Sequence, residues 1–349
     1  MHGEYKVPGG KLVVADVSVQ DGRLSKVSIS GDFFLEPDSA LNTINGALSG
    51  QSEQSSVAEL TKAIESALDP SVVMMGISAQ AVAIAVRRAL GKATRWEDHT
   101  FDVIDTVTMD AAKHVALDEA IVGSVAAGRR GPTLRLWDWD DSVVVIGSFQ
   151  SVRNEIDQEN ADQYGIRVVR RVTGGGAMFM EPGNCITYSL VVPGSLVEGL
   201  TLEQSYAFLD DWVLGALGDV GIKARYVPLN DIASDAGKIG GAAQKRFASG
   251  IVLHHATMAY DINASRMMEV LRIGREKISD KGIRSANKRV DPMRSQTGMP
   301  RRAVMDAFLA HFRKRYHSRM SEYTAGELAL ADRLVADKFN TEEWTHRVP

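Results

Sequence analysis

The chain of 349 residues is long enough for two domains, each with a hydrophobic core of its own. Its 44% hydrophobic and 24% charged residues are typical of a soluble globular protein, and its net charge of −4 argues against a broad nucleic-acid-binding surface. A single cysteine, Cys185, excludes an intramolecular disulfide, and the polar first residues and short apolar runs indicate neither a signal peptide nor a membrane span. We therefore expect a cytoplasmic protein that binds neither nucleic acid nor membrane.

The first 91 residues predict a small α+β domain. Two β-rich runs, 12–19 and 24–29, flank Asp21-Gly22, which is a hairpin signal. Three helices are expected to follow, over about 38–48, from Ser55 or Ser56 to residue 68, and from Ser78 to residue 90. No cluster of chemically reactive side chains accompanies them, so this region reads as an accessory domain.

The remaining residues, 92–349, alternate β-rich runs with a few helices, which predicts an α/β domain of the α+β type with a mixed sheet. A helix is expected to begin after Asp110. Its Asp118-Glu119 pair has two interpretations, a functional role or a solvated helix face, and the solvated face is favoured. The runs 133–137 and 142–146 are expected to be neighbouring strands around a turn. Helices are expected over about 201–217, 299–316 and 325–339.

A glycine-rich stretch lies at the centre of this domain, where Arg170-Arg171 precedes Val172-Thr173 and three glycines, Gly174, Gly175 and Gly176. The arrangement predicts a strand, a loop and a second strand. Because glycine has no Cβ, a ligand can lie directly against the loop backbone, and an arginine fork beside it is suited to a carboxylate or phosphate. A flexible hairpin with a basic edge is the alternative, and the flanking Arg-Arg and Gly183-Asn184 disfavour it.

The stretch 170–177, with Gly183-Asn184 downstream, resembles the lipoate-binding loop of lipoate–protein ligases. The resemblance extends over the chain, weakly before residue 92, and implies a biotin/lipoate ligase-like catalytic domain with the accessory domain at its N-terminal side. It implies that Arg171 contacts the activated acyl group. The lipoate and ATP site would also include the loop and its flank: Thr173, Gly174, Gly175, Gly176, Ala177, Met178, Phe179 and Asn184. Met180-Glu181 replaces the family's His-Asp.

A second cluster begins at Asn230-Asp231 and continues into Lys238-Ile239-Gly240-Gly241-Ala242-Ala243. A lysine among small residues can approach a substrate closely and neutralise charge at phosphorus, although a lone lysine is more often a surface ion-pair partner. By resemblance Lys238 is the catalytic lysine, Asn230, Gly241 and Ala243 join the site, and Asp231 is the Mg²⁺ ligand.

The run 251–258 predicts a strand carrying His254 and His255 on opposite faces, with one buried and one at the surface. The family has His-His-Gly-Thr here, and Ala256 stands for the glycine. By resemblance His255 belongs to the site. The polar stretch 279–290, with Lys281, resembles the family's adenylate-binding loop, and its glycine and basic residues suit a mobile lid.

The resemblance implies a two-step reaction. Lipoate and MgATP form lipoyl-adenylate, and a lysine then takes the lipoyl group on apo lipoyl domains of 2-oxoacid dehydrogenase E2 subunits or on the glycine cleavage H protein. An octanoyltransferase of the same fold would need an activated thiolate, and Cys185 lies away from the position that the cysteine enzymes use. A biotin ligase is disfavoured because its Gly-Arg-Gly-Arg-type loop is absent. A non-catalytic ligand-binding homologue is the third alternative.

Overall fold

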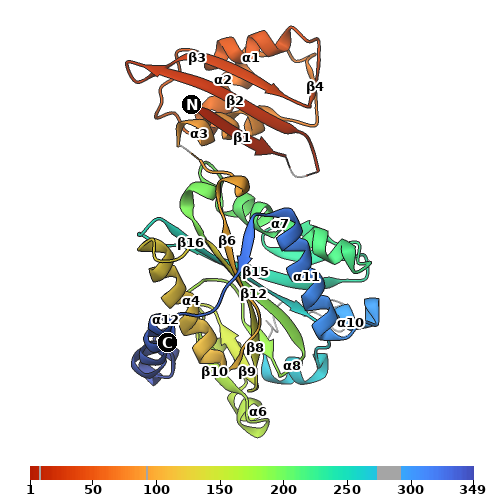
Figure 1. The fold of residues 1–349 in the computed structure, drawn as a ribbon. Helices are drawn as coiled ribbons and strands as arrows, with labels where there is room; N and C mark the ends of the chain where they lie inside the picture. Colours follow the sequence, from red (N-terminus) through yellow and green to blue (C-terminus); the bar gives the residue numbers. More distant parts are fainter. Residues whose placement is uncertain (8, 92, 273–291) are drawn as a thin grey trace. The chain divides into compact units, whose positions relative to one another are not determined.

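The computed structural model describes residues 1–7, 9–91, 93–272 and 292–349. The chain forms two compact units, one of residues 1–96 with 194–208 and one of residues 97–193 with 209–349 (Figure 1). The expected lid, 279–290 with Lys281, lies outside the described residues. Within the described part, no helix combines the length and apolar character needed to cross a membrane.

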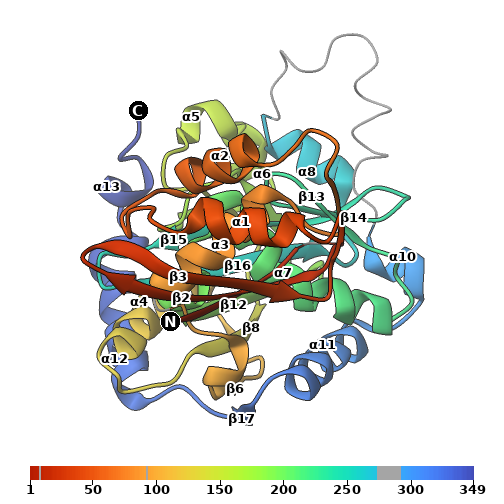
Figure 2. The ribbon, with the colours of Figure 1, turned by 90° about the horizontal axis from the view of Figure 1, so that it is seen from above.

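The first unit is a three-stranded antiparallel sheet with helices on one side (Figure 2). The expected hairpin is confirmed: its turn has left-handed backbone angles at Asp21 (φ 52°) and Gly22 (φ 72°). The expected helix starts are also confirmed, since Ser56 forms a capping box with Glu59, and Ser78 accepts a hydrogen bond from the amide of Ala81. The elements are β1 (His2–Lys6), β2 (Leu12–Gln20), β3 (Arg23–Gly31), β4 (Phe34–Glu36), α1 (Ala40–Leu48), α2 (Val57–Ala67), β5 (Val73–Met75) and α3 (Ala79–Leu90).

The second unit is built on a nine-stranded mixed sheet, which confirms the predicted fold class. The strand order is β13-β14-β15-β16-β12-β8-β6-β17, and β7 pairs with β8 beside this path. Strands β6 and β17 run parallel to their neighbours, whereas β12, β16, β15 and β14 are antiparallel. The strands are β6 (Phe101–Ile104), β7 (Thr108–Met109), β8 (Thr133–Trp139), β12 (Cys185–Pro193), β13 (Arg225–Val227), β14 (Asp231–Ala233), β15 (Lys238–Arg246), β16 (Ile251–Ala259) and β17 (Ser318–Met320).

Helices cover both faces of this sheet, which explains why β12 and β16 are buried along their lengths. Helices α4 (Ala111–Ala126) and α12 (Ala325–Leu334) lie on one face, and α7 (Leu202–Asp219) and α11 (Arg301–Arg315) on the other (Figure 1). The shorter helices are α5 (Val152–Glu155), α6 (Gln158–Gln163), α8 (Ala264–Val270), α10 (Met293–Thr297) and α13 (Glu342–Thr345).

A second, small sheet carries the glycine-rich segment. Its order is β10-β9-β11, with β9 (Val143–Ile146) between β10 (Arg167–Arg170) and β11 (Met178–Met180). The expectation that 133–137 and 142–146 are neighbouring strands is therefore wrong, because β8 belongs to the large sheet and β9 to the small one. The Asp-containing turn at 139–141 sends the chain from one sheet into the other, and this leaves β9 free to pair with β10 in parallel.

Candidate active site

The glycine-rich loop connects β10 to β11 and folds back over the end of β9. Gly175 has a φ of +92°, which L side chains rarely adopt, and a Cβ on it would lie 3.6 Å from the Cβ of Ala243 on β15. A Cβ on Gly147, at the end of β9, would lie 2.1 Å from the carbonyl oxygen of Gly175. Glycine is required at 147 because backbone meets backbone there, and at 175 because of the positive φ. The loop thus lies between β9 and the large sheet.

Arg171 shapes this loop from inside the protein. Its guanidinium donates through Nη2 to the carbonyls of Gly174 (2.7 Å) and Gly176 (2.8 Å), and through Nη1 to that of Val145 (3.0 Å). Its Nε donates to Oγ1 of Thr173 at 3.0 Å. The side chain is 2% exposed. The sequence suggested a fork directed at a carboxylate or phosphate, whereas here this fork binds the loop's own carbonyls and fixes the loop conformation.

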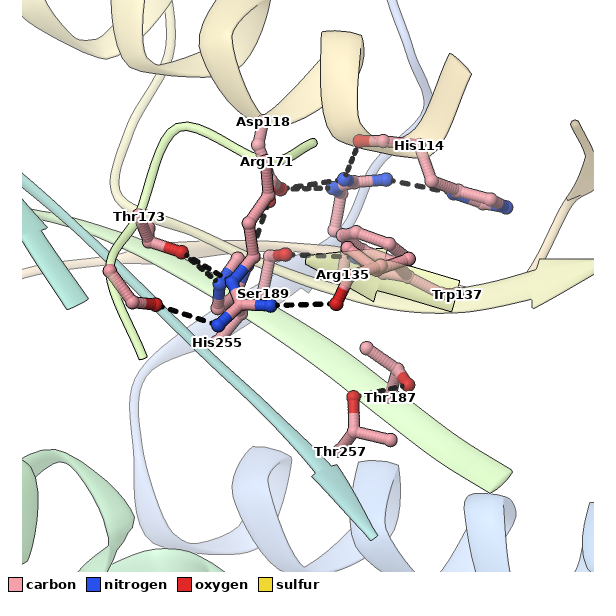
Figure 3. Close-up of polar contacts among 12 residues, drawn as sticks. His114, Asp118, Arg135, Trp137, Arg171, Thr173, Thr187, Ser189, His255 and Thr257 are labelled. Carbon is pink, nitrogen blue, oxygen red and sulfur yellow. Dashed lines mark hydrogen bonds and ion pairs between the residues drawn. The ribbon is translucent and has the colours of Figure 1, made fainter. Parts of the chain in front are cut away.

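A chain of hydrogen bonds continues from the loop into the core (Figure 3). Thr173 Oγ1 lies 2.7 Å from Nε2 of His255, and Nδ1 of that ring lies 3.0 Å from Oδ2 of Asp118. Burial lowers the pKa of His255, against the opposing effect of Asp118, so the ring is neutral. Since the carboxylate only accepts, we assign the ring proton to Nδ1, and Thr173 then donates to Nε2.

Asp118 is the anchor of this chain, contrary to the expectation of a solvated helix face. It is 1% exposed and forms an ion pair with Arg135 on β8, with 2.6 Å between Nη2 and Oδ1. Although burial alone would raise the pKa of Asp118, Arg135 lowers it below its ordinary value. His114, stacked on Trp137, also faces Arg135, and its pKa is lowered to about 3 by burial and by that arginine. This network therefore contains the Asp118–Arg135 ion pair, and the two histidine rings beside it, His114 and His255, are neutral.

The two adjacent histidines point to opposite faces of β16, as expected, but both are buried. His254 is 0% exposed and hydrogen-bonds Asp210 of α7 at 2.7 Å, on the face away from the glycine-rich loop. The expectation of one surface histidine is wrong, because β16 is an interior strand covered by helices on both faces.

Lys238 and Asp231 form an exposed ion pair at the start of β15. The Lys238 Nζ lies 2.8 Å from Oδ1 of Asp231, and the two side chains are 47% and 36% exposed. A Cβ on Gly241 would lie 3.3 Å from that carboxylate oxygen and 3.5 Å from the ammonium, so the missing side chain leaves room for both. Asn230 has a structural role here, since its Nδ2 donates to the carbonyl of Ala242 at 2.6 Å.

Strand β15 brings the lysine and the glycine-rich loop to one site. Gly241 and Ala243 are two residues apart and so face the same side of the sheet. The first lies beside the Lys238 pair and the second beside Gly175. Their partners on β16 are Thr257 and His255, respectively. An extended ligand lying along this face would contact the loop and the ammonium together.

The apolar residues after the loop divide between two faces. Met178 and Met180 pack into the core cluster around α4, whereas Phe179, only 2% exposed, packs with Ala177 against Val144. Alternate residues of β11, Met178 and Met180, therefore share one face, and Phe179 faces the other side. The alternation of a strand separates them.

Asn184 directly precedes β12, and Cys185 is the first residue of that strand. Asn184 is 5% exposed, its Oδ1 accepts from the amide of Glu181 at 2.9 Å, and its Nδ2 has no partner among the described residues. Cys185 is 1% exposed, and its Sγ lies 3.8 Å from the carbonyl oxygen of Phe179. Burial raises the pKa of this thiol to about 12. Asn184 thus retains a free buried donor, whereas Cys185 is an inert core residue.

Sequence reasoning misjudged the burial of Asp118 and did not single out Arg135 or Phe149. The first two had a usable signal, since an arginine inside the otherwise apolar run 133–137 of a buried strand requires a buried anion. Phe149 is 80% exposed next to Gly174, at a position between Gly147 and Gln150 that the motif leaves variable.

Most strands of the mixed sheet and the residues of this site belong to a segment that matches one family of known proteins. The family description "Lipoyl protein ligase A/B catalytic domain" matches residues 110–313, more than half of the chain. The chain belongs to this family, as its glycine-rich loop indicated.

Individual relatives carry two kinds of name. The chain is 30% identical to lipoate-protein ligase A subunit 1 of Thermoplasma acidophilum over 66% of this chain and 90% of the relative. It is 25% identical to octanoyltransferase LipM of Halalkalibacterium halodurans over 71% and 99%, respectively. Among solved structures, a bi-partite lipoate protein ligase from T. acidophilum, studied with its E2 lipoyl domain, matches with a TM-score of 0.64 and 28% identity over 72% and 98%.

Proposed function

We propose that this protein is an ATP-dependent lipoate–protein ligase that forms lipoyl-adenylate and then an amide with a lysine of an acceptor domain. The observation that carries the proposal is the state of Cys185. It is the only cysteine of the sequence, it is buried, and burial raises the pKa of its thiol to about 12, which favours the protonated form near neutral pH. A transfer through a cysteine thioester needs a thiolate within reach of the substrate, and this side chain does not provide one.

The exposed Lys238 supports an adenylation reaction in place of transfer through a cysteine thioester. In that step the lipoate carboxylate attacks the α-phosphorus of ATP, and the bond to pyrophosphate breaks. Negative charge on the phosphoryl oxygens is best stabilised by fixed cations and amide donors. Lys238 offers an ammonium beside Gly241, and in this proposal the loop amides, Thr173, Asn184 and Ala243 line the path of the acyl chain. Arg171 and His255 support the loop from behind.

A Mg²⁺ ion bound with the nucleotide fits the site in one specific way. The described residues contain no group of three His, Cys, Asp or Glu side chains that would hold a metal ion alone. Mg²⁺ commonly binds through one or two carboxylates together with substrate phosphates. Asp231 is the carboxylate available for this mode, and binding the ion would compete with its 2.8 Å pair to Lys238.

The proposal includes the acceptor and the accessory domain. Acceptors would be apo lipoyl domains of 2-oxoacid dehydrogenase E2 subunits and the glycine cleavage H protein, which implies action in the cytoplasm. Residues 1–91, which lie within the first structural unit, would take the place of the family's accessory domain.

The deciding experiment is lipoate-stimulated exchange between ATP and pyrophosphate, followed by transfer to an apo lipoyl domain. A ligase shows exchange with lipoate and none without it. Absence of exchange, with ATP-independent transfer from an octanoyl thioester, would falsify the proposal. Octanoyltransferase is the second candidate because several relatives are named so.

A further inference from the structure

The loop of residues 147–150, between β9 and α5, is the outer neighbour of the glycine-rich loop. Its Ser148 amide donates to the carbonyl of Thr173 at 2.8 Å, and Gly147 packs against the carbonyl of Gly175. At its tip, the Phe149 ring lies 80% exposed beside Gly174. The conformation of the glycine-rich loop therefore depends on where the 147–150 loop is held.

Arg170 ties this outer loop to a distant segment of the chain. Its Nη1 donates to three carbonyls of the outer loop, those of Gly147 (2.9 Å), Ser148 (3.3 Å) and Gln150 (2.6 Å). Its Nη2 donates to the carbonyl of Thr345 at 2.6 Å, and its Nε is shared by the carbonyls of Trp344 and Thr345 at 3.0 Å each. The side chain is 0% exposed, and each of its three nitrogens donates to backbone oxygens.

The distant segment also reaches the outer loop directly. Arg347 donates through Nη2 to the carbonyl (2.7 Å) and the hydroxyl (2.6 Å) of Ser148. Its guanidinium lies 4.2 Å from the centre of the Trp344 ring, and the indole Nε1 donates to the carbonyl of Arg170 at 2.8 Å. We call Trp344, Thr345 and Arg347 the α13 clasp.

We propose that the α13 clasp is a positioning element of the acyl site, which sets ligand affinity by fixing the 147–150 loop against the glycine-rich loop. The inference rests on the proposed function only in taking lipoate as the ligand. Trp344 and Arg347 are positioning residues, since each acts through Arg170 or Ser148 on a loop that borders the ligand. Preorganisation of this kind lowers the ordering cost of binding.

A purely stabilising role for the clasp makes a different prediction, so the test separates affinity from stability. Arg347→Ala removes both bonds to Ser148, and Trp344→Phe removes only the indole donor while keeping an aromatic ring. His346→Ala is the matched control, because His346 belongs to the same segment and pairs with Glu342 instead of the outer loop. Three quantities are measured on the full chain: the lipoate dissociation constant without ATP, amide exchange at Ser148, and the melting temperature.

We expect Arg347→Ala to raise the lipoate dissociation constant about tenfold and to speed exchange at Ser148. Trp344→Phe should do the same to a smaller extent, Arg347→Lys should recover part of the affinity, and His346→Ala should match wild type. Unchanged affinity and exchange in both clasp variants would overturn the inference, as would a wild type that binds no lipoate. A wild type that binds lipoate but catalyses no pyrophosphate exchange would overturn the ligase proposal alone.

Discussion

The two ends of the candidate site are built in opposite ways. At the glycine-rich loop every charged group is buried: Arg171 is 2%, Asp118 1% and Arg135 0% exposed, and each is engaged by hydrogen bonds. At the start of β15, Lys238 and Asp231 are 47% and 36% exposed and form one ion pair. One end is thus a rigid scaffold and the other an accessible charge.

This difference predicts which mutations affect folding and which affect chemistry. A buried ion pair that loses one partner leaves an uncompensated charge in the core, which is strongly destabilising. An exposed pair adds little to stability because water and salt screen it. Changes at the scaffold should therefore reduce the free energy of unfolding, whereas changes at the exposed pair should reduce turnover in a protein that melts normally.

The largest effect on stability is expected from Asp118→Ala. This change removes the buried counter-ion of Arg135 and the acceptor of the His255 Nδ1 proton. We therefore expect the free energy of unfolding to fall by about 3–5 kcal/mol. Chemical denaturation followed by circular dichroism measures this. Glu119→Ala is the control. The Glu119 side chain, next to Asp118 in the sequence, is 29% exposed and pairs with Lys338. Loss of this pair should lower the free energy of unfolding by about 1 kcal/mol or less. Equal costs for the two variants would contradict the scaffold assignment.

Lys238→Ala should have the largest effect on activity. Loss of one preorganised charged donor costs about 3–4 kcal/mol of transition-state stabilisation, roughly a hundred- to thousand-fold in rate. Pyrophosphate exchange and transfer from supplied lipoyl-adenylate should both fall, with an unchanged melting temperature. Lys238→Arg should recover little, because a planar fork replaces a compact ammonium. Lys245→Ala on the same strand, also exposed, is the control. Near-wild-type rates in both half-reactions would show that Lys238 is a surface charge with no role in the reaction.

A smaller effect is expected from Gly175→Val, which should strain the loop backbone and weaken ligand binding together. The φ of +92° disfavours any side chain, and its Cβ would meet Nη2 of Arg171 at 3.0 Å, so we expect strain of about 1–3 kcal/mol. The strain should appear as weaker lipoate binding, measured by calorimetry, since the loop borders the ligand. Gly176→Ala is the control, because nothing lies within 4 Å of its Cβ. Normal lipoate affinity of Gly175→Val would show that the loop is not the acyl site.

The sequence predicted those parts of the fold whose signals are local. The capping residues Ser56, Ser78 and Asp110 and the Asp21-Gly22 turn each act within a few residues, and the structure has all of them. The pairing of β9 with β10 and β11 was missed because strand partners depend on the path of the whole chain.

The site shows the same limit. The motif containing Lys238 could be located by resemblance, but its pairing with Asp231 could not. The burial of Asp118 was misjudged because a carboxylate on a helix is normally solvated. Only its three-dimensional neighbours, Arg135 and His255, make its position in the core favourable.

The smallest effect is expected from Cys185→Ala, and its smallness is informative. Cys185 is buried in the same core as the scaffold, and its thiol has a pKa of about 12. Removing its sulfur leaves a small cavity, with an expected cost of about 1 kcal/mol in the free energy of unfolding. If acyl transfer proceeds through an adenylate, exchange and transfer rates should stay within about twofold of wild type, because no step uses the thiol. Mass spectrometry after treatment of the folded protein with iodoacetamide should also find Cys185 unmodified. Loss of transfer in Cys185→Ala, at a normal melting temperature, would place this buried sulfur in the reaction and the protein among the thioester-forming transferases.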